Sequence, residues 1–341
     1  MKEKLLFFSI KHPLLYILLL ATVLRLLAVI FTEGFYWRIT EYNFNYYRIP
    51  ETWLSNPWIV YISRLVFGAF SLLIITLSYR ITKIIADKTT ALEIALLLSC
   101  FWMMPYVSVH SITAIVSIPF VLYGTLLIVK QDNLLSNNDI EKFHRTTFII
   151  AGFFLGLGFA VCHVSFVYYL GVIIALFILK NWKGALMTLI GYIFAVGITQ
   201  TVIDIIIYHR PFVEMTVLFQ NITDYLTFGT DWGLYALVLL IAFIPPMSFL
   251  LITGFIRVCC KYLLLLIPTL VMFFFAFFTG EHNFEAILVI IPTYLIGGYV
   301  GWKEYYKKSE FWTKRKWPIW TCYSFFALLN TLLLICTYFY L

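Results

Sequence analysis

The chain has 341 residues, of which 62% are hydrophobic, 19% aromatic and only 12% charged. Charged residues usually make up about 25% of a soluble domain, so this composition excludes a soluble globular protein and indicates a multi-pass membrane protein. The formal net charge is +7, but the cations follow the membrane topology described below. We therefore expect no nucleic acid partner.

Apolar segments long enough to cross a bilayer, about 20 residues each, recur along the chain. They predict an all-α polytopic membrane protein with eleven transmembrane helices. The first segment lacks a small-residue cleavage site, so we expect it to remain as a helix rather than to be removed as a signal peptide. The predicted spans are residues 13–32, 59–79, 90–108, 112–129, 146–162, 164–179, 184–207, 234–255, 262–280, 284–302 and 318–340.

Most of the 24 Lys and Arg residues fall at the termini of these spans on one face. By the positive-inside rule this face is cytoplasmic, which predicts a cytoplasmic N-terminus and an extracytoplasmic C-terminus. The basic connections on this face are expected to contact membrane lipids. A composition rich in Ile, Lys, Phe and Asn favours a bacterial inner membrane over the endoplasmic reticulum.

Two long connections lie on the predicted outer face, residues 33–58 and 208–233. The first is too polar to span a bilayer and too aromatic for an ordinary loop, which indicates a segment with interfacial helical character. It contains Glu33 and Glu41 among its carboxylates. Two loops of this length are long enough to cover one cavity together.

Titratable side chains gather on the same outer face. Arg64 lies a few residues inside the second predicted span, and Asp204 lies near the outer end of the seventh. A charged group at such a depth must pair, extend to the interface or face a polar cavity, so an anchoring role and a functional role both stay open. Asn221 begins a glycosylation sequon, which matters only if the outer face is an endoplasmic reticulum lumen.

Several motifs follow one another in a recognisable order. They are the acidic first outer loop, Arg64 near the start of a span, YVSVHSITAIVSIPF, the segment from VIDIIIYHRPF to LFQNITDYLTFGTDWG, and EHNFEAILVIIP. In this order the chain resembles the polyprenol-phosphate-mannose-dependent alpha-mannosyltransferases, a family of GT-C membrane glycosyltransferases. The best-matched residues are Asp204, Tyr208, Asn221 and Gly229, and then His282, Glu285 and Pro292.

The resemblance implies a single GT-C-like transmembrane domain over residues 1–341 with about eleven helices. It also implies an inverting transfer of a sugar, with mannose expected, from a polyprenyl-phosphate donor to a lipid-linked or glycan acceptor on the extracytoplasmic face. A carboxylate in the first outer loop would act as the base, which assigns this role to Glu41, with Glu33 as the substitute. No cofactor or divalent metal is expected, and the six cysteines show no metal-ligand spacing.

Under this hypothesis, the substrate-binding candidates are residues that offer hydrogen bonds or charge to a phosphate or a hydroxyl group. They are Arg38, Arg64, His110, Asp204, Asn221, His282 and Glu285.

Two alternatives stay open. The chain has Thr40, His110, Ala114 and Ala286 where the resemblance leads us to expect charged residues. This favours a catalytically eroded relative that binds lipid-linked sugars or serves as an assembly subunit, and whether a partner subunit supplies the missing charges stays open. The second alternative is a polysaccharide or lipid transporter, although transporter sites tend to lie near the bilayer midplane on broken helices.

Overall fold

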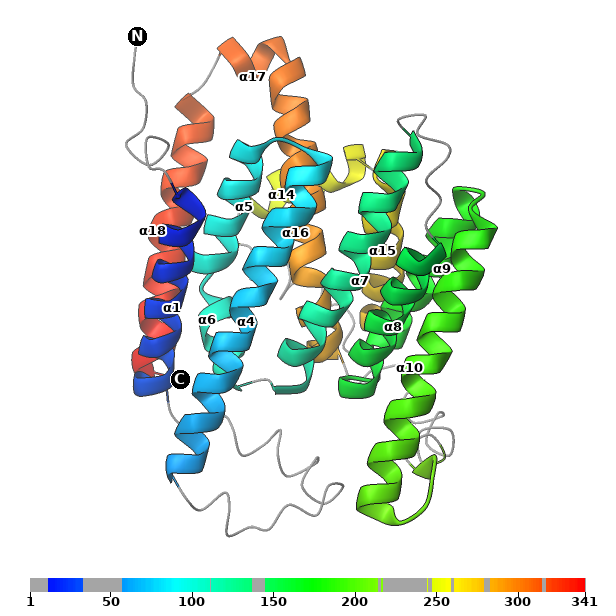
Figure 1. Ribbon diagram of the computed structural model, residues 1–341. Coiled ribbons are helices and arrows are strands. Elements are labelled where there is room, and N and C mark those ends of the chain that lie inside the picture. Colours follow the sequence, from blue (N-terminus) through cyan, green and yellow to red (C-terminus); the bar gives the residue numbers. More distant parts are fainter. Residues whose placement is uncertain are drawn as a thin grey trace. The chain divides into compact units, whose positions relative to one another are not determined.

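The computed structural model describes residues 12–32, 57–110, 112–136, 145–213, 216, 244, 247–258, 261–278, 283–314 and 317–340. Within these ranges the regular elements are all helices (Figure 1). They are α1 (Pro13–Phe31), α4 (Pro57–Ile85), α5 (Lys88–Cys100), α6 (Met103–His110), α7 (Ile112–Ser136), α8 (Arg145–Val161), α9 (Ser165–Ile178), α10 (Trp182–Tyr208), α14 (Met247–Val258), α15 (Leu263–Phe278), α16 (Asn283–Lys308), α17 (Glu310–Lys314) and α18 (Trp317–Tyr340).

Six of these helices are long and apolar enough to cross a membrane, namely α1, α4, α7, α10, α16 and α18. The pair α5 and α6 meets the same test together, bent by 61°, and four shorter apolar helices accompany them. Each of the eleven predicted spans overlaps at least one described helix, so the all-α, multi-pass architecture is confirmed. The count of eleven spans and the GT-C fold stay predictions.

Helices are expected in a membrane because each backbone N–H and C=O group then finds a hydrogen-bond partner within the same segment, where water is absent. Exposed side chains along α1 and α10 are largely Leu, Ile, Val and Phe, which suits contact with lipid. Two helix starts carry side-chain caps. The Thr90 N–H donates to Asp87 at 3.0 Å, and the Gly184 N–H donates to Asn181 at 3.0 Å.

The chain divides into two compact units. One consists of Met1–Ile112 with Ala327–Leu341, and the other of Thr113–Phe326. The sequence predicted a single domain over residues 1–341, and this stays a prediction. We describe each unit separately.

In the first unit, buried polar contacts join α1 to α4. The Arg25 guanidinium in α1 is 3% exposed and donates to the Ser71 hydroxyl at 2.5 Å and to the Ala21 carbonyl at 3.1 Å. A Cβ atom on Gly68, one turn before Ser71, would lie 3.8 Å from the Cβ of Arg25. These contacts show how a guanidinium is accommodated inside an apolar helix pair, through neutral oxygen acceptors.

The break between α5 and α6 is held by the last helix. The Asn330 side chain in α18 accepts from the Trp102 N–H at 2.9 Å and donates to the Cys100 carbonyl at 2.7 Å. Both backbone groups lie at the bend, where intrahelical partners are missing. Further along α18, the Tyr338 hydroxyl donates to the Leu24 carbonyl at 2.8 Å, which ties α18 to α1.

In the second unit, glycines allow helices to approach with their backbones. A Cβ atom on Gly191 of α10 would lie 1.9 Å from the Ile149 carbonyl oxygen of α8, and one on Gly152 of α8 would lie 1.9 Å from the Thr188 carbonyl oxygen. On α14, a Cβ atom on Gly254 would lie 2.0 Å from the Gly298 carbonyl oxygen of α16. Small residues at such interfaces are the usual means of close helix packing in membranes.

Candidate functional site

Arg64 occupies a buried position near the start of α4. Its side chain is 6% exposed, and Nη1 donates to the Thr32 carbonyl oxygen at 2.8 Å. Thr32 follows the last residue of α1 and has extended backbone angles. The carbonyl groups at a helix C-terminus lack intrahelical partners and carry partial negative charge, so they are suitable acceptors for a guanidinium.

Tyr106 and His110 form a stacked pair in α6. Their ring centroids lie 4.4 Å apart with an interplanar angle of 26°. The Nδ1 atom of His110 lies 2.8 Å from the Tyr106 carbonyl oxygen, which favours a proton on that nitrogen. His110 is 2% exposed and Tyr106 is 9% exposed, so packing fixes both rings.

These residues belong to the same unit and interact. α4 packs against α6 in this unit, and Arg64 lies within electrostatic range of both Tyr106 and His110. We call Thr32, Arg64, Tyr106 and His110 the Arg64 cluster. It combines a fixed guanidinium with an imidazole and a phenol near the terminus of α1, and residue 33 begins the predicted first outer loop. A guanidinium with several N–H donors is well suited to a phosphate oxygen.

The structure brings together two of the predicted site residues, Arg64 and His110. Asp204 lies in α10, in the other unit, and is fully buried. Glu285 lies in α16, and its side chain is not among those described. The other candidates lie outside the described residues: Glu33, Arg38, Glu41, Asn221 and His282.

The predicted outer loops lie largely outside the described residues as well. For the segment 33–58, the structure describes only the start of α4 from Pro57. For the segment 208–233, α10 extends to Tyr208, and His209 follows in the left-handed region with φ of 56°. The predicted interfacial helical character of the first loop therefore stays a prediction.

Two positions where the resemblance led us to expect charge are small and inaccessible. Ala114 in α7 and Ala286 in α16 are both 0% exposed. A charged side chain in such an interior would require a partner or a polar cavity. At these positions the chain has apolar packing.

Sequence reasoning missed Tyr106 and Thr32 as members of the cluster. Tyr106 precedes His110 by four residues, the spacing that places two side chains on one face of a helix, so the pair was detectable once residues 103–110 were assigned to a helix. The side chain of Thr32 gives no indication of this role, because the acceptor is the backbone carbonyl oxygen. It becomes an acceptor because α1 ends there and α4 places Arg64 beside it.

Among the described residues, no group of three His, Cys, Asp or Glu side chains is arranged to hold a metal ion. The absence of a metal requirement stays a prediction, since several carboxylates and histidines lie outside the described ranges.

Comparisons with known proteins assign neither a family nor a function to the chain. No protein-family model matches the chain, and no curated protein matches it.

Proposed function

We propose that the chain is a membrane glycosyltransferase that transfers a sugar, mannose in the first instance, from a polyprenyl-phosphate donor to a lipid-linked or glycan acceptor. The supporting observation is the Arg64 cluster. It fixes a buried guanidinium at the Thr32 carbonyl, one residue before Glu33 and the acidic first outer loop. The guanidinium is thus bound to the residue that directly precedes Glu33 in the chain.

In the proposed reaction, the Glu41 carboxylate takes the proton of an acceptor hydroxyl group. The hydroxyl oxygen attacks the anomeric carbon of the sugar from the face opposite the phosphate. The bond between the anomeric carbon and the phosphate oxygen breaks, its electron pair stays on that oxygen, and polyprenyl phosphate departs. The anomeric configuration inverts, and Glu33 is the substitute base.

The Arg64 cluster would contribute by stabilising the charge that develops on the leaving phosphate. N–H donors of a fixed guanidinium need no reorganisation as this charge develops, which is the condition under which electrostatic stabilisation is strongest. His110 has its Nδ1 directed to the Tyr106 carbonyl oxygen, which fixes the orientation of the imidazole ring beside Tyr106. Burial of both residues excludes bulk water, which strengthens such interactions.

The direct test uses the purified full chain in proteoliposomes with mannosyl-phosphoryl-polyprenol and a set of lipid-linked and free glycan acceptors. We expect a new glycoside, detected by mass spectrometry, with release of polyprenyl phosphate in equal amount. Absence of both products with every acceptor, from protein that is monodisperse and folded, would contradict the transferase proposal. Donor binding without turnover would instead support the catalytically eroded relative.

Arg64 gives a more specific prediction. Arg64→Gln should lower the transfer rate by about 10- to 100-fold, because a hydrogen bond to a charged group contributes about 1.5–3 kcal/mol. Arg64→Lys should retain part of the activity, since it keeps the charge and loses the geometry of the guanidinium. The measurement is the initial rate of glycoside formation at a saturating acceptor concentration.

Arg80→Gln is the matched control, since Arg80 lies in the same helix and its side chain is exposed. It should leave the rate unchanged. Equal losses in Arg64→Gln and Arg80→Gln would show that removal of any cation from α4 impairs the protein, and would remove the assigned role of Arg64.

Transport of a lipid-linked sugar is a second candidate function, and two observations favour it. The pair α5 and α6 is bent by 61°, as in the broken helices of transporters. In the other unit, Gln200 and Asp204 are both 0% exposed and lie one turn apart on α10, and the Gln200 amide has no hydrogen-bond partner among the described residues. Buried polar groups inside a membrane helix commonly mark a substrate or ion path.

The two functions differ in their products. A transporter moves a labelled polyprenyl-phosphate sugar between leaflets without forming a glycoside, and Asp204→Asn should slow this movement. Movement without glycoside would replace the transferase proposal, whereas glycoside formation that is unaffected by Asp204→Asn would remove the transport candidate.

A further inference from the structure

A basic and aromatic segment joins α16 to α18. Its sequence from residue 303 to residue 317 is KEYYKKSEFWTKRKW, with six cations and two carboxylates. Both carboxylates have a described lysine partner. Glu304 accepts from Lys261 at 2.6 Å, and Glu310 accepts from Lys314 at 3.2 Å. The net charge of this segment is therefore strongly positive.

The base of this segment is fixed to neighbouring helices. The Tyr262 hydroxyl also donates to Glu304 at 3.2 Å, and the Arg257 guanidinium lies 3.7 Å from the centre of the Tyr305 ring. The hydrogen bond to Glu304 raises the pKa of Lys261 above its usual range, so Lys261 stays charged at neutral pH. The termini of α14, α15 and α16 thus form one basic platform.

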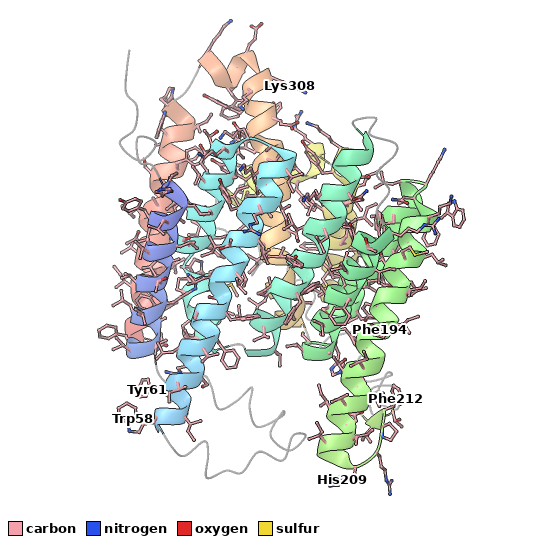
Figure 2. The ribbon with its side chains drawn as sticks, in the orientation of Figure 1. Trp58, Tyr61, Phe194, His209, Phe212 and Lys308 are labelled. Carbon is pink, nitrogen blue, oxygen red and sulfur yellow. The ribbon has the colours of Figure 1, made fainter. Side chains whose placement is uncertain are left out.

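Beyond this platform, cations and aromatic rings are exposed together. Lys307 and Lys308 are exposed at the last turn of α16, where Figure 2 labels Lys308, and Lys314 is exposed in α17. Trp312 packs edge-on against Trp302 with ring centroids 5.5 Å apart, which folds α17 back onto α16. Phe311 is left 53% exposed.

The first turn of α18 continues the pattern. Trp317 is 73% exposed and Trp320 is 64% exposed, and their spacing of three residues places them on one side of the helix. Tryptophan side chains at the termini of apolar helices favour the membrane–water interface, where the ring is half in the apolar phase and the N–H is hydrated. The exposed lysines therefore lie at the level of lipid headgroups.

We propose that these residues form an anionic-lipid site, in which Lys307, Lys308 and Lys314 bind the headgroups of phospholipids such as phosphatidylglycerol while Trp317 and Trp320 lie among them. The positive charge of the three exposed lysines favours an anionic lipid as the ligand. The exposed aromatic rings favour a lipid over a free phosphate. A lipid contacts both the lysines and the apolar rings at the terminus of a spanning helix, whereas a dissolved anion contacts only the lysines. This site is separate from the Arg64 cluster and does not depend on sugar transfer.

The test measures the lipids that stay with the purified full chain. The protein is equilibrated in mixed micelles that contain equal amounts of phosphatidylglycerol and phosphatidylcholine, and retained lipids are counted by native mass spectrometry. We expect phosphatidylglycerol to be enriched over phosphatidylcholine at low salt and this enrichment to be lost at high salt, since attraction of exposed charges is screened within about 10 Å at 0.1 M salt.

The triple variant Lys307→Gln/Lys308→Gln/Lys314→Gln should lose most of this enrichment, since each cation near an anionic surface contributes about fivefold in partitioning. The matched control Lys83→Gln/Lys88→Gln/Lys130→Gln removes three exposed lysines elsewhere and should keep most of it. The variant Trp317→Ser/Trp320→Ser should retain fewer lipids of both kinds with the preference unchanged.

Equal enrichment in the wild-type protein and the first triple variant would overturn the proposal, as would an equal loss in both triple variants. Displacement of phosphatidylglycerol by millimolar inorganic phosphate at constant ionic strength would also overturn it, because it would identify a site for a free anion. Elution volume and apparent Tm of each variant show whether it is folded.

Discussion

Glu41→Gln is expected to lower the rate of sugar transfer by about 100- to 10,000-fold, the usual contribution of a general base. Glutamine keeps the shape and hydrogen-bonding capacity of the side chain but does not accept a proton. The acceptor hydroxyl would then attack as the neutral alcohol, whereas binding of the donor through Arg64 would persist. The measurement is the single-turnover rate of glycoside formation, together with the donor affinity.

Glu51→Gln is the control for this prediction, since Glu51 is another carboxylate of the same predicted loop and has no assigned role. It should retain the wild-type rate. If Glu33→Gln abolishes transfer and Glu41→Gln does not, the base is Glu33. If both variants transfer sugar at the wild-type rate, the assignment of the base to this loop is wrong.

Gly191→Ala is expected to destabilise the protein by about 1–3 kcal/mol, the usual cost of overpacking a close contact. The new methyl group would lie 1.9 Å from the Ile149 carbonyl oxygen and 2.9 Å from the Phe153 backbone nitrogen. Neither backbone atom is able to rotate away, so α8 and α10 must separate. We expect a fall of several degrees in apparent Tm, measured at one fixed scan rate because unfolding of such proteins is commonly irreversible.

Gly197→Ala is the matched control on the same helix. A Cβ atom there meets nothing within 4 Å, and alanine is favoured over glycine within a helix by about 0.8–1.0 kcal/mol. The apparent Tm should therefore stay constant or rise slightly. A similar fall for both variants would show that the glycines matter for helix flexibility rather than for the distance between α8 and α10.

Arg64 and Asp204 show how far sequence reasoning reaches at a single position. The sequence identifies each as a charged residue in or near a span, whose side chain needs a partner or a polar environment. This requirement is visible without the structure because the cost of a charge in hydrocarbon does not depend on the fold. Which group accommodates it does depend on the fold. Arg64 donates to a backbone carbonyl of α1, and no side-chain pattern in the sequence encodes that acceptor.

Arg25 lies within the first predicted span, residues 13–32, and the sequence pattern gave no indication of its role. Its acceptors are Ser71, 46 positions away, and Ala21, one turn before it. Serine is common in membrane helices, so its presence in α4 did not identify it as the partner. Only the approach of α1 and α4 at Gly68 makes this contact.

By itself, the sequence determined that this is an all-helical, multi-pass membrane protein and where its apolar segments lie, because hydropathy and segment length reflect the cost of exposing backbone and charge to lipid. The tertiary structure alone decided which helices touch, where glycines allow backbones to meet, and that Tyr106, His110 and Arg64 share one cluster. Lipid solvates the apolar face of one helix as well as another, so hydropathy selects no partners. Those pairings depend on shape and on a few hydrogen bonds between residues far apart in the chain.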